Sequence, residues 1–177
     1  DYIIEADEPL PVIPNSSIGD AERQIGEYCA SLIEDGSTIQ AGIGKLPNAV
    51  LDALSDKKDL GVHSELFTTK MMELAERGII NASKKTLHKG INVATVLEGT
   101  KELYDWAHDN PSVQLFPVEY VNDPGIIAKN DKLVSINSCI EVDLFGQVAA
   151  ESFGYKQATG AGGQVDFVRG ATMSKDG

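Results

Sequence analysis

A regular alternation of short β-branched runs with segments of helical spacing constrains this 177-residue chain more than any other feature. Residues 38–41 and 91–96 contain β-branched residues typical of strands. Residues 68–77 and 102–107 have the pattern of helices. Strands separated by helices predict βαβ units. We therefore expect an α/β fold with a mainly parallel sheet flanked by helices.

The two ends of the chain depart from this alternation. Residues 1–16 contain three of the seven prolines and several acidic residues, and we interpret them as an extended linker or arm. The helix expected next has its apolar residues at Ile25, Cys29, Leu32 and Ile33. Residues 133–140 and 142–149 are expected to form two antiparallel strands, a hairpin near the C-terminus, with a Gly-rich loop at 159–163 after them.

Charge and cysteine content exclude several classes of function. The chain has 27 acidic and 15 basic residues and a net charge of -12, which argues against a nucleic-acid partner and against a basic membrane-surface helix. No apolar run approaches the roughly 20 residues that span a bilayer. Cys29 and Cys139 are too few and too far apart for a disulfide framework or a zinc site. We expect a cytoplasmic protein that holds no metal and binds no membrane.

A pair of glycines, Gly42 and Gly44, follows the first expected strand. Glycines at this spacing let a backbone turn sharply and bring its N–H groups close to a ligand. Pro47 follows them, and neither the third glycine of a dinucleotide-binding pattern nor a P-loop Lys-Ser/Thr pair is present. A tight structural turn is therefore an equally good interpretation of this motif.

Two titratable residues, His63 and Glu65, stand at the end of another expected strand. In open α/β sheets, ligands bind at the carboxyl ends of strands. A carboxylate at this place can serve as a base, a metal ligand or a nucleophile, and the alternative is a solvated acid. His63 fits a hydrogen-bonded histidine of the strand or core better than a catalyst.

The third motif is the sequence 160–167, in which Gly160, Gly162 and Gly163 precede Gln164 and Asp166. Such a loop can present backbone N–H donors to an oxyanion. A long connection with Asp166 capping the next turn is the alternative.

Four segments together resemble one family. Residues 42–50 (GIGKLPNAV), 62–65 (VHSE), 137–148 (NSCIEVDLFGQV) and 160–171 (GAGGQVDFVRGA) are similar to the acetyl-CoA hydrolase/transferase group of CoA-transferases. The resemblance extends from about Ile18 onward. It implies that residues 17–177 are the catalytic second domain, incomplete at the C-terminus, and that an N-terminal domain of the same chain is missing here.

The resemblance also implies a covalent mechanism. In this family a glutamate at the position of Glu65 attacks an acyl-CoA, and CoA passes through a glutamyl-CoA thioester to a carboxylate such as acetate. The acyl group is 4-hydroxybutyryl, butyryl, acetyl or a similar short chain. A carboxylate is a weak nucleophile, so the carbonyl oxygen needs hydrogen-bond donors. The oxyanion and CoA-binding residues implied by the resemblance are Gly42, Ile43, Gly44, Lys45, Leu46, Ile140, Gly162 and Gly163.

Several alternatives stay open at this point. The same nucleophile would serve an acyl-CoA hydrolase, and a non-catalytic CoA-binding module is a third possibility. Glu141 is the second candidate for the nucleophile. The resemblance implies CoA and acyl-CoA as substrates, no tightly bound cofactor, no metal, and a homo-oligomer.

Overall fold

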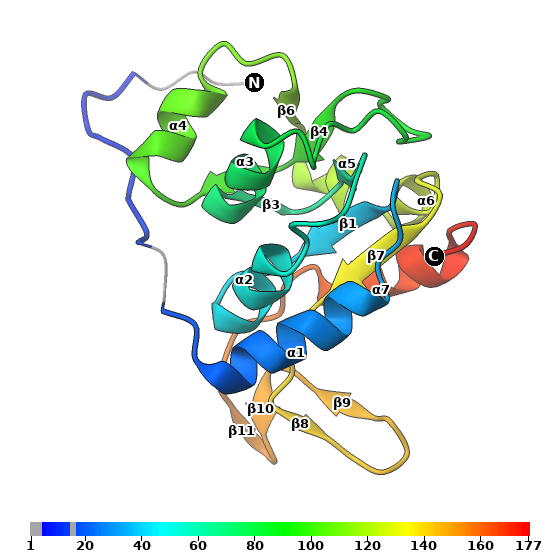
Figure 1. Cartoon of the computed structure of the whole chain (residues 1–177). Coiled ribbons are helices and arrows are strands. Elements are labelled where there is room, and N and C mark those ends of the chain that lie inside the picture. The colour runs from blue at the N-terminus through cyan, green and yellow to red at the C-terminus, as the bar shows by residue number, and fades with distance from the viewer. Residues whose placement is uncertain (1–4, 15–16) are drawn as a thin grey trace.

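The centre of the molecule is a parallel sheet, in a computed structural model that describes residues 5–14 and 17–177. Strand β1 (Thr38–Ala41) pairs in parallel with β2 (Gly61–Val62) on one side and with β7 (Leu133–Ile136) on the other. All four residues of β1 are buried, which agrees with its place in the middle (Figure 1). The predicted α/β fold with a mainly parallel sheet is confirmed.

The sheet continues beyond β2 through the backbone of His63. This residue forms a parallel bridge with Val93 in β4 (Asn92–Ala94), and β4 pairs in parallel with β6 (Val113–Leu115). A second parallel pair joins β3 (Leu66–Thr68) to β5 (Val96–Glu98). The two pairs separate beside Glu65, whose carbonyl accepts hydrogen bonds from the N–H groups of Thr95 and Val96, both at 3.0 Å.

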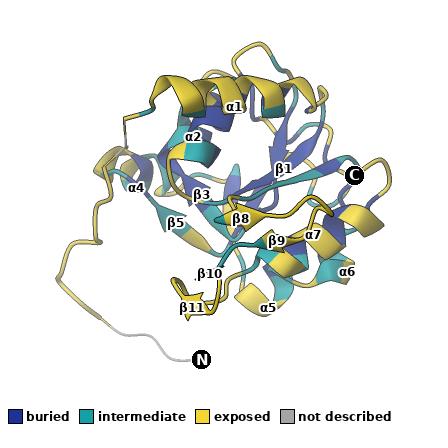
Figure 2. Cartoon of the chain, turned by 90° about the horizontal axis from the view of Figure 1, so that it is seen from below, coloured by how far each residue is buried: buried dark blue, intermediate teal, exposed yellow. Residues whose placement is uncertain are grey.

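Helices surround these strands, and each turns an exposed side outward (Figure 2). The helices described are α1 (Asp20–Ser31), α2 (Lys45–Asp52), α3 (Thr69–Glu76), α4 (Lys101–Ala107), α5 (Val118–Val121), α6 (Pro124–Ile127) and α7 (Gln164–Met173). The sequence patterns did not predict α7. A large core lies among α1–α4 and β1, where Phe67 stacks on Trp106 with ring centroids 5.7 Å apart. A smaller core of Val93, Val121, Ile127, Leu133, Phe167 and Ala171 lies beneath α5, α6 and α7.

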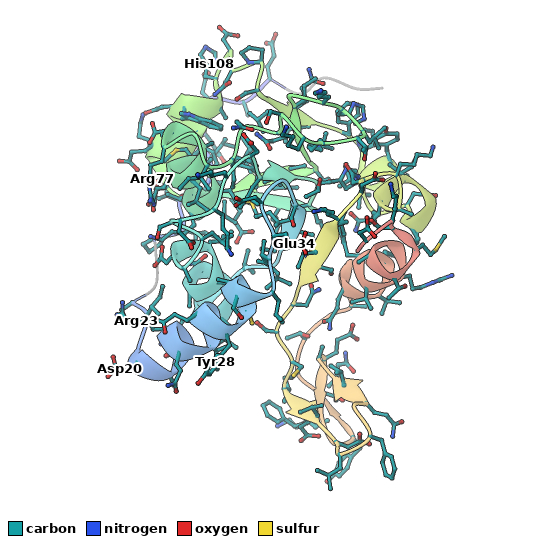
Figure 3. The ribbon with its side chains drawn as sticks, turned by 45° about the vertical axis from the view of Figure 1, so that its right-hand side comes forward. Asp20, Arg23, Tyr28, Glu34, Arg77 and His108 are labelled. Carbon is teal, nitrogen blue, oxygen red and sulfur yellow. The ribbon has the colours of Figure 1, made fainter. Side chains whose placement is uncertain are left out.

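Helix α1 confirms only part of the face that its apolar residues predicted. Ile33 is buried and Cys29 packs against the large core, whereas Ile25 and Leu32 are exposed. Gly26 and Ala30 are buried instead. Figure 3 shows Tyr28 on the outer side of this helix. The reason is steric: a Cβ at Gly26 would overlap the carbonyl group of Ala49 in α2, so only this face allows the two helices to approach so closely.

The strand expected at 133–140 is shorter than predicted. It pairs in parallel with β1 and not antiparallel with residues 142–149. Its first four residues are β7, which pairs in parallel with β1 because its apolar side chains complete the central sheet. The antiparallel hairpin expected near the C-terminus is present further along. Strand β8 (Glu141–Val142) pairs with β9 (Val148–Ala149), and β10 (Ser152–Phe153) with β11 (Lys156–Gln157). These two hairpins project from the body (Figures 1 and 3) and expose Leu144, Phe145 and Tyr155.

The segment interpreted as a linker or arm lies partly outside the described residues, at 1–4 and 15–16. Residues 5–14 are exposed and contain no helix or strand. The N–H of Ile13 donates to the carbonyl of Gly99 at 2.9 Å, and the hydroxyl of Tyr104 donates to the carbonyl of Pro11 at 2.7 Å. This segment therefore contacts α4 and Gly99, which lies two residues before that helix. In the described ranges, no helix is long and apolar enough to cross a membrane.

The close contact of α1 with α2 generates a test of stability. In an open helix site, replacing Gly with Ala stabilises by up to about 1 kcal/mol. Because a Cβ at Gly26 would overlap Ala49, we expect Gly26→Ala to destabilise the protein by about 1–3 kcal/mol instead. Thermal unfolding measures the effect, with Gln24→Ala on the exposed side of the same helix as the control. A Gly26→Ala protein as stable as the control would contradict the packing described.

Candidate active site

A cleft of about 200 Å³ lies at the carboxyl ends of β1 and β7, next to the residues that follow β2. Its wall includes three of the sequence motifs: the turn after β1, Glu65, and the Gly-rich loop before α7. The lining residues are Gln40, Ala41, Gly42, Ile43, Glu65, Leu66, Asn137, Ala150, Glu151, Thr159, Gly160, Gly162, Gly163, Gln164 and Phe167. The topology of a parallel sheet brings these distant segments together, because its strand ends share one edge.

The half-buried side chain of Glu65 is held by an amide from another part of the chain. The Nδ2 of Asn122, directly after α5, donates to Glu65 Oε2 at 2.9 Å. The backbone on both sides of Glu65 belongs to the sheet: the N–H of Ser64 donates to the carbonyl of Val93 at 3.1 Å. The carboxylate therefore has a fixed backbone and one fixed side-chain donor.

The start of α7 lies directly against this carboxylate. A Cβ added to Gly163 would overlap both Glu65 Oε2 and Asn122 Nδ2, so any other residue there would displace these side chains, although the φ angle of -79° suits any residue. Helix α7 begins at the next residue, and the N–H groups of its first turn have no partner within the helix. This helix end favours negative charge beside Glu65.

A second polar cluster occupies the ends of β1 and β7. Ser135 Oγ donates to Gln40 Oε1 at 2.6 Å, and Asn137 Nδ2 donates to Ser135 Oγ at 2.8 Å. Gln40 Nε2 in turn donates to Asn137 Oδ1 at 3.2 Å. Gln40 and Asn137 thus present neutral amides to the cleft that contains Glu65.

The buried basic groups next to the site are His63 and Lys85. Burial lowers the pKa of His63 to about 4. The hydrogen bond between its Nε2 and the carbonyl of Val121, at 2.9 Å, raises the pKa but by less than burial lowers it. Burial also lowers the pKa of Lys85 to about 7. The Nζ of Lys85 donates to the carbonyls of Val62 and Ile91 at 2.8 and 2.9 Å. Near neutral pH, His63 is therefore an uncharged hydrogen-bonding group, as its sequence context suggested.

The structure brings together five of the nine residues that the sequence nominated. Gly42, Ile43, Glu65, Gly162 and Gly163 all line the cleft. Four others lie outside its lining: Gly44, Lys45 and Leu46 form the start of α2, and Ile140 precedes β8, where its N–H donates to the carbonyl of Ala149 at 2.9 Å. Their role in binding CoA stays a prediction. Glu141, the second candidate nucleophile, is exposed on β8 and also lies outside the cleft.

Sequence reasoning missed Asn122, Gln40, Asn137 and Glu151. Asn122 carries no sequence signal of its own, because it lies 57 positions after Glu65 and its hydrogen bond to Glu65 forms only in the folded chain. Asn137 stands within one of the four motifs, so position relative to the strand end could have identified it. Gln40 is a polar residue within a buried strand. A polar residue in such a strand is unusual, so the sequence could have marked Gln40 as a candidate site residue.

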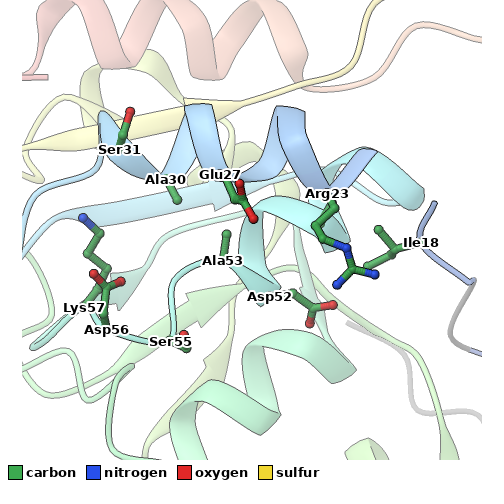
Figure 4. Close-up of a pocket in the computed structure, with 11 residues that line it drawn as sticks. Ile18, Arg23, Glu27, Ala30, Ser31, Asp52, Ala53, Ser55, Asp56 and Lys57 are labelled. Atoms are coloured by element: carbon green, nitrogen blue, oxygen red, sulfur yellow. The ribbon is translucent and has the colours of Figure 1, made fainter. Parts of the chain in front are cut away.

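A larger groove of about 460 Å³ lies between α1 and α2, away from this chemistry (Figure 4). Charged side chains of both signs line it, with Arg23 near one end and Lys57 near the other. None of the nine residues nominated as catalytic or CoA-binding lines it, and Ala49 is the one lining residue that belongs to a motif. We assign the site to the smaller cleft, because a held carboxylate, a helix start and two of the glycine motifs meet there. Within the described ranges, no cluster of three or more His, Cys, Asp or Glu side chains could hold a metal ion.

Comparisons with known proteins identify the same group as the sequence motifs. Residues 99–177 match the family model of the acetyl-CoA hydrolase/transferase C-terminal domain. All 177 residues align with the 4-hydroxybutyrate coenzyme A transferase of Clostridium kluyveri at 57% identity, covering 41% of that protein. Identity is 49% to the succinyl-CoA:cyclohexane-1-carboxylate CoA transferase of Geobacter metallireducens, of which 40% is covered. Relatives described as acetyl-CoA hydrolases are more distant, at 26% identity for Candida albicans.

Solved structures agree. The crystal structure of 4-hydroxybutyrate CoA-transferase from Porphyromonas gingivalis matches with a TM-score of 0.85 and 49% identity, over 99% of this chain and 41% of that one. In fold, the chain is therefore a domain of the CoA-transferase type. Its residues 99–177 match the acetyl-CoA hydrolase/transferase family, which is the family that the four motifs indicated. It spans about two fifths of the length of the relatives that it matches.

The contact at Gly163 generates a structural test. We expect Gly163→Ala to push Glu65 and Asn122 apart, so that a crystal structure of the variant no longer has the 2.9 Å hydrogen bond between them. Gly160→Ala is the matched control from the same loop, because nothing lies within 4 Å of a Cβ there. An intact Asn122–Glu65 bond in the Gly163→Ala structure would contradict the assigned packing.

The burial of His63 generates a test of pH dependence. Its pKa is about 4 in the folded protein and near 6.5 in an unfolded chain. Between these values the unfolded state binds more protons, so His63 lowers the free energy of unfolding as the pH falls from about 6.5 to about 4. We expect His63→Gln, which cannot charge, to lose less stability over this range than the wild type. Denaturant unfolding at pH 7 and pH 4.5 measures it, and equal losses in both proteins would contradict the prediction.

Proposed function

We propose that a full-length protein carrying this chain is a CoA-transferase that uses Glu65 as its covalent nucleophile. The observation that carries the proposal is the carboxylate itself: Glu65 is half-buried, held by Asn122 at 2.9 Å, and lies against the start of α7 in a cleft at the strand ends. A solvated acid has none of these features.

The reaction proceeds in two balanced halves. Glu65 attacks the thioester carbonyl of an acyl-CoA, which forms an acyl-glutamyl anhydride and releases CoA thiolate. The thiolate then attacks the glutamyl carbonyl, which releases the first carboxylate and leaves a glutamyl-CoA thioester. An acceptor carboxylate attacks this thioester and forms a new anhydride. The departing thiolate attacks the acyl carbonyl of that anhydride, giving a new acyl-CoA and free Glu65.

Each attack places negative charge on a carbonyl oxygen, and the cleft supplies donors for it. The start of α7 and Ile43 line the same cleft as Glu65, whereas the N–H of Gly42 donates to the carbonyl of Ile136. Removing one donor of this kind costs roughly 3 kcal/mol of transition-state stabilisation. Gly162, Gly163 and Ile43 are therefore proposed as oxyanion residues, as the family resemblance implies.

Two observations favour transfer over hydrolysis, and a third favours small acyl groups over large ones. A transferase must keep water from its anhydride and thioester, and Glu65 is only half exposed in a narrow cleft. The relatives described as transferases are also nearer in sequence than those described as hydrolases. The cleft of about 200 Å³ is below the roughly 300–1,000 Å³ of typical ligand pockets, which suits a short acyl chain.

Substitution of Glu65 tests the proposed function. In the full-length protein, Glu65→Ala is expected to lower acyl exchange between butyryl-CoA and acetate by at least about 1,000-fold, since removal of a covalent nucleophile can cost far more. Glu65→Asp is expected to lose most activity, because its carboxylate stands back by one C–C bond. Glu76→Ala, an exposed acid on α3, is the control. Exchange that survives in Glu65→Ala would overturn the proposal.

The acceptor requirement separates the transferase from the hydrolase. We expect butyryl-CoA to be converted to acetyl-CoA in the presence of acetate. Without a carboxylate acceptor, we expect the consumption of butyryl-CoA after the first turnover to fall at least about tenfold. Chromatographic separation of butyryl-CoA, acetyl-CoA and free CoA measures both rates. Equal loss with and without acetate would identify a hydrolase, and CoA binding without any turnover would identify a binding module.

A further inference from the structure

His63 takes no part in the proposed chemistry, yet it lies next to three segments that build the site. It precedes Glu65 by two residues in the connection between β2 and β3. Its Nε2 is 2.9 Å from the carbonyl of Val121, the residue before Asn122. Its ring lies 6.3 Å from that of Phe167, in the first turn of α7. The imidazole is completely buried among these neighbours.

The hydrogen bond fixes the tautomer of this histidine. A backbone carbonyl can only accept, so Nε2 must carry the hydrogen and Nδ1 must be unprotonated. Nδ1 is buried and has no hydrogen-bond partner among the residues that the structure describes. Burial also keeps the ring uncharged near neutral pH. His63 is therefore a neutral donor with one directed bond, and that bond ends on the segment that carries Asn122.

The two partners of the catalytic pair are held in different ways. The Glu65 segment is part of the sheet: the N–H of His63 donates to the carbonyl of Ile39 at 3.1 Å, and the carbonyl of Glu65 accepts two further bonds. Asn122 lies outside the sheet, after the single turn of α5. Its backbone N–H donates to Val118 in that same turn, which does not tie the turn to the strands. The bond between His63 and Val121 ties the end of this turn to the strands, in addition to the packing of Val121 in the smaller core.

We propose that His63 is a positioning residue, which sets the Asn122 amide against Glu65 through its hydrogen bond to the carbonyl of Val121. The inference rests on the proposed function, because it assigns His63 to the geometry of that nucleophile. It differs from a role in folding alone, since a purely structural histidine would affect stability and not the rate of a folded enzyme. A displacement of about 1 Å within a catalytic pair can cost about 100-fold in rate.

Three substitutions in the full-length protein test the proposal. His63→Leu fills the site without a donor and is expected to lower kcat of butyryl-CoA:acetate exchange about 10- to 100-fold, with KM for butyryl-CoA changed less than about threefold. His63→Gln carries an amide that reaches Val121 and is expected to keep kcat within about threefold of wild type. His63→Asn is too short to reach and is expected to behave like the leucine variant. If His63→Leu does not fold, the comparison of kcat between His63→Gln and His63→Asn tests the proposal by itself.

Ser174→Ala provides the matched control for a lost buried hydrogen bond. Ser174 Oγ is buried and donates to the carbonyl of Asn130 at 2.6 Å, at the opposite end of β7 from the cleft. We expect this variant to unfold at a lower temperature and to keep the kcat of the wild type. Rates are compared at a temperature where every variant is folded.

A double-mutant cycle shows whether His63 acts through Asn122. If it does, His63→Leu with Asn122→Ala is no slower than Asn122→Ala alone, because the amide to be positioned is already absent. Additive losses in the double variant, a wild-type kcat in folded His63→Leu, or a His63→Gln protein as slow as His63→Asn would each overturn the inference. Failure of the proposed function is distinguishable from all of these, since the wild-type protein itself would then show no exchange.

Discussion

The bond from the Asn122 amide to the Glu65 carboxylate is the interaction on which the rest of the site depends. It joins a residue fixed by a parallel sheet to one that follows a single helical turn. The smaller core, with Val121 and Phe167, holds that turn and α7 against the sheet. Gly163 completes the arrangement, because any side chain there would displace both partners.

This arrangement supports the proposed role of the Glu65 carboxylate as a nucleophile. One amide donor fixes its direction, and the start of a ten-residue helix favours negative charge beside it. In the proposed reaction, the same helix end stabilises the charge that develops on the oxygen of the attacked acyl carbonyl. Neutral amides of Gln40 and Asn137 line the other side of the cleft, so the described lining contains no cation that would pair with Glu65.

Sequence patterns predicted the parts of this structure that depend on local composition. The alternation of strands and helices gave the parallel sheet, and the motifs located Glu65 and both glycine loops in one cleft. The patterns failed where tertiary contact decides. Helix α1 buries Gly26 because of α2, and β7 is parallel because β1 is beside it. Asn122 meets Glu65 only through the fold, and nothing in the residues around it announces that contact.

The central claim is that Glu65 becomes covalently linked to CoA, and trapping that link tests it most directly. The full-length protein is mixed with butyryl-CoA, treated with borohydride and digested, and its peptides are weighed by mass spectrometry. Reduction of a glutamyl-CoA thioester to an alcohol removes one oxygen from the original carboxyl group and adds two hydrogens. The account predicts this change in the peptide containing Glu65. An unchanged Glu65 peptide from protein that has consumed its substrate would contradict the account.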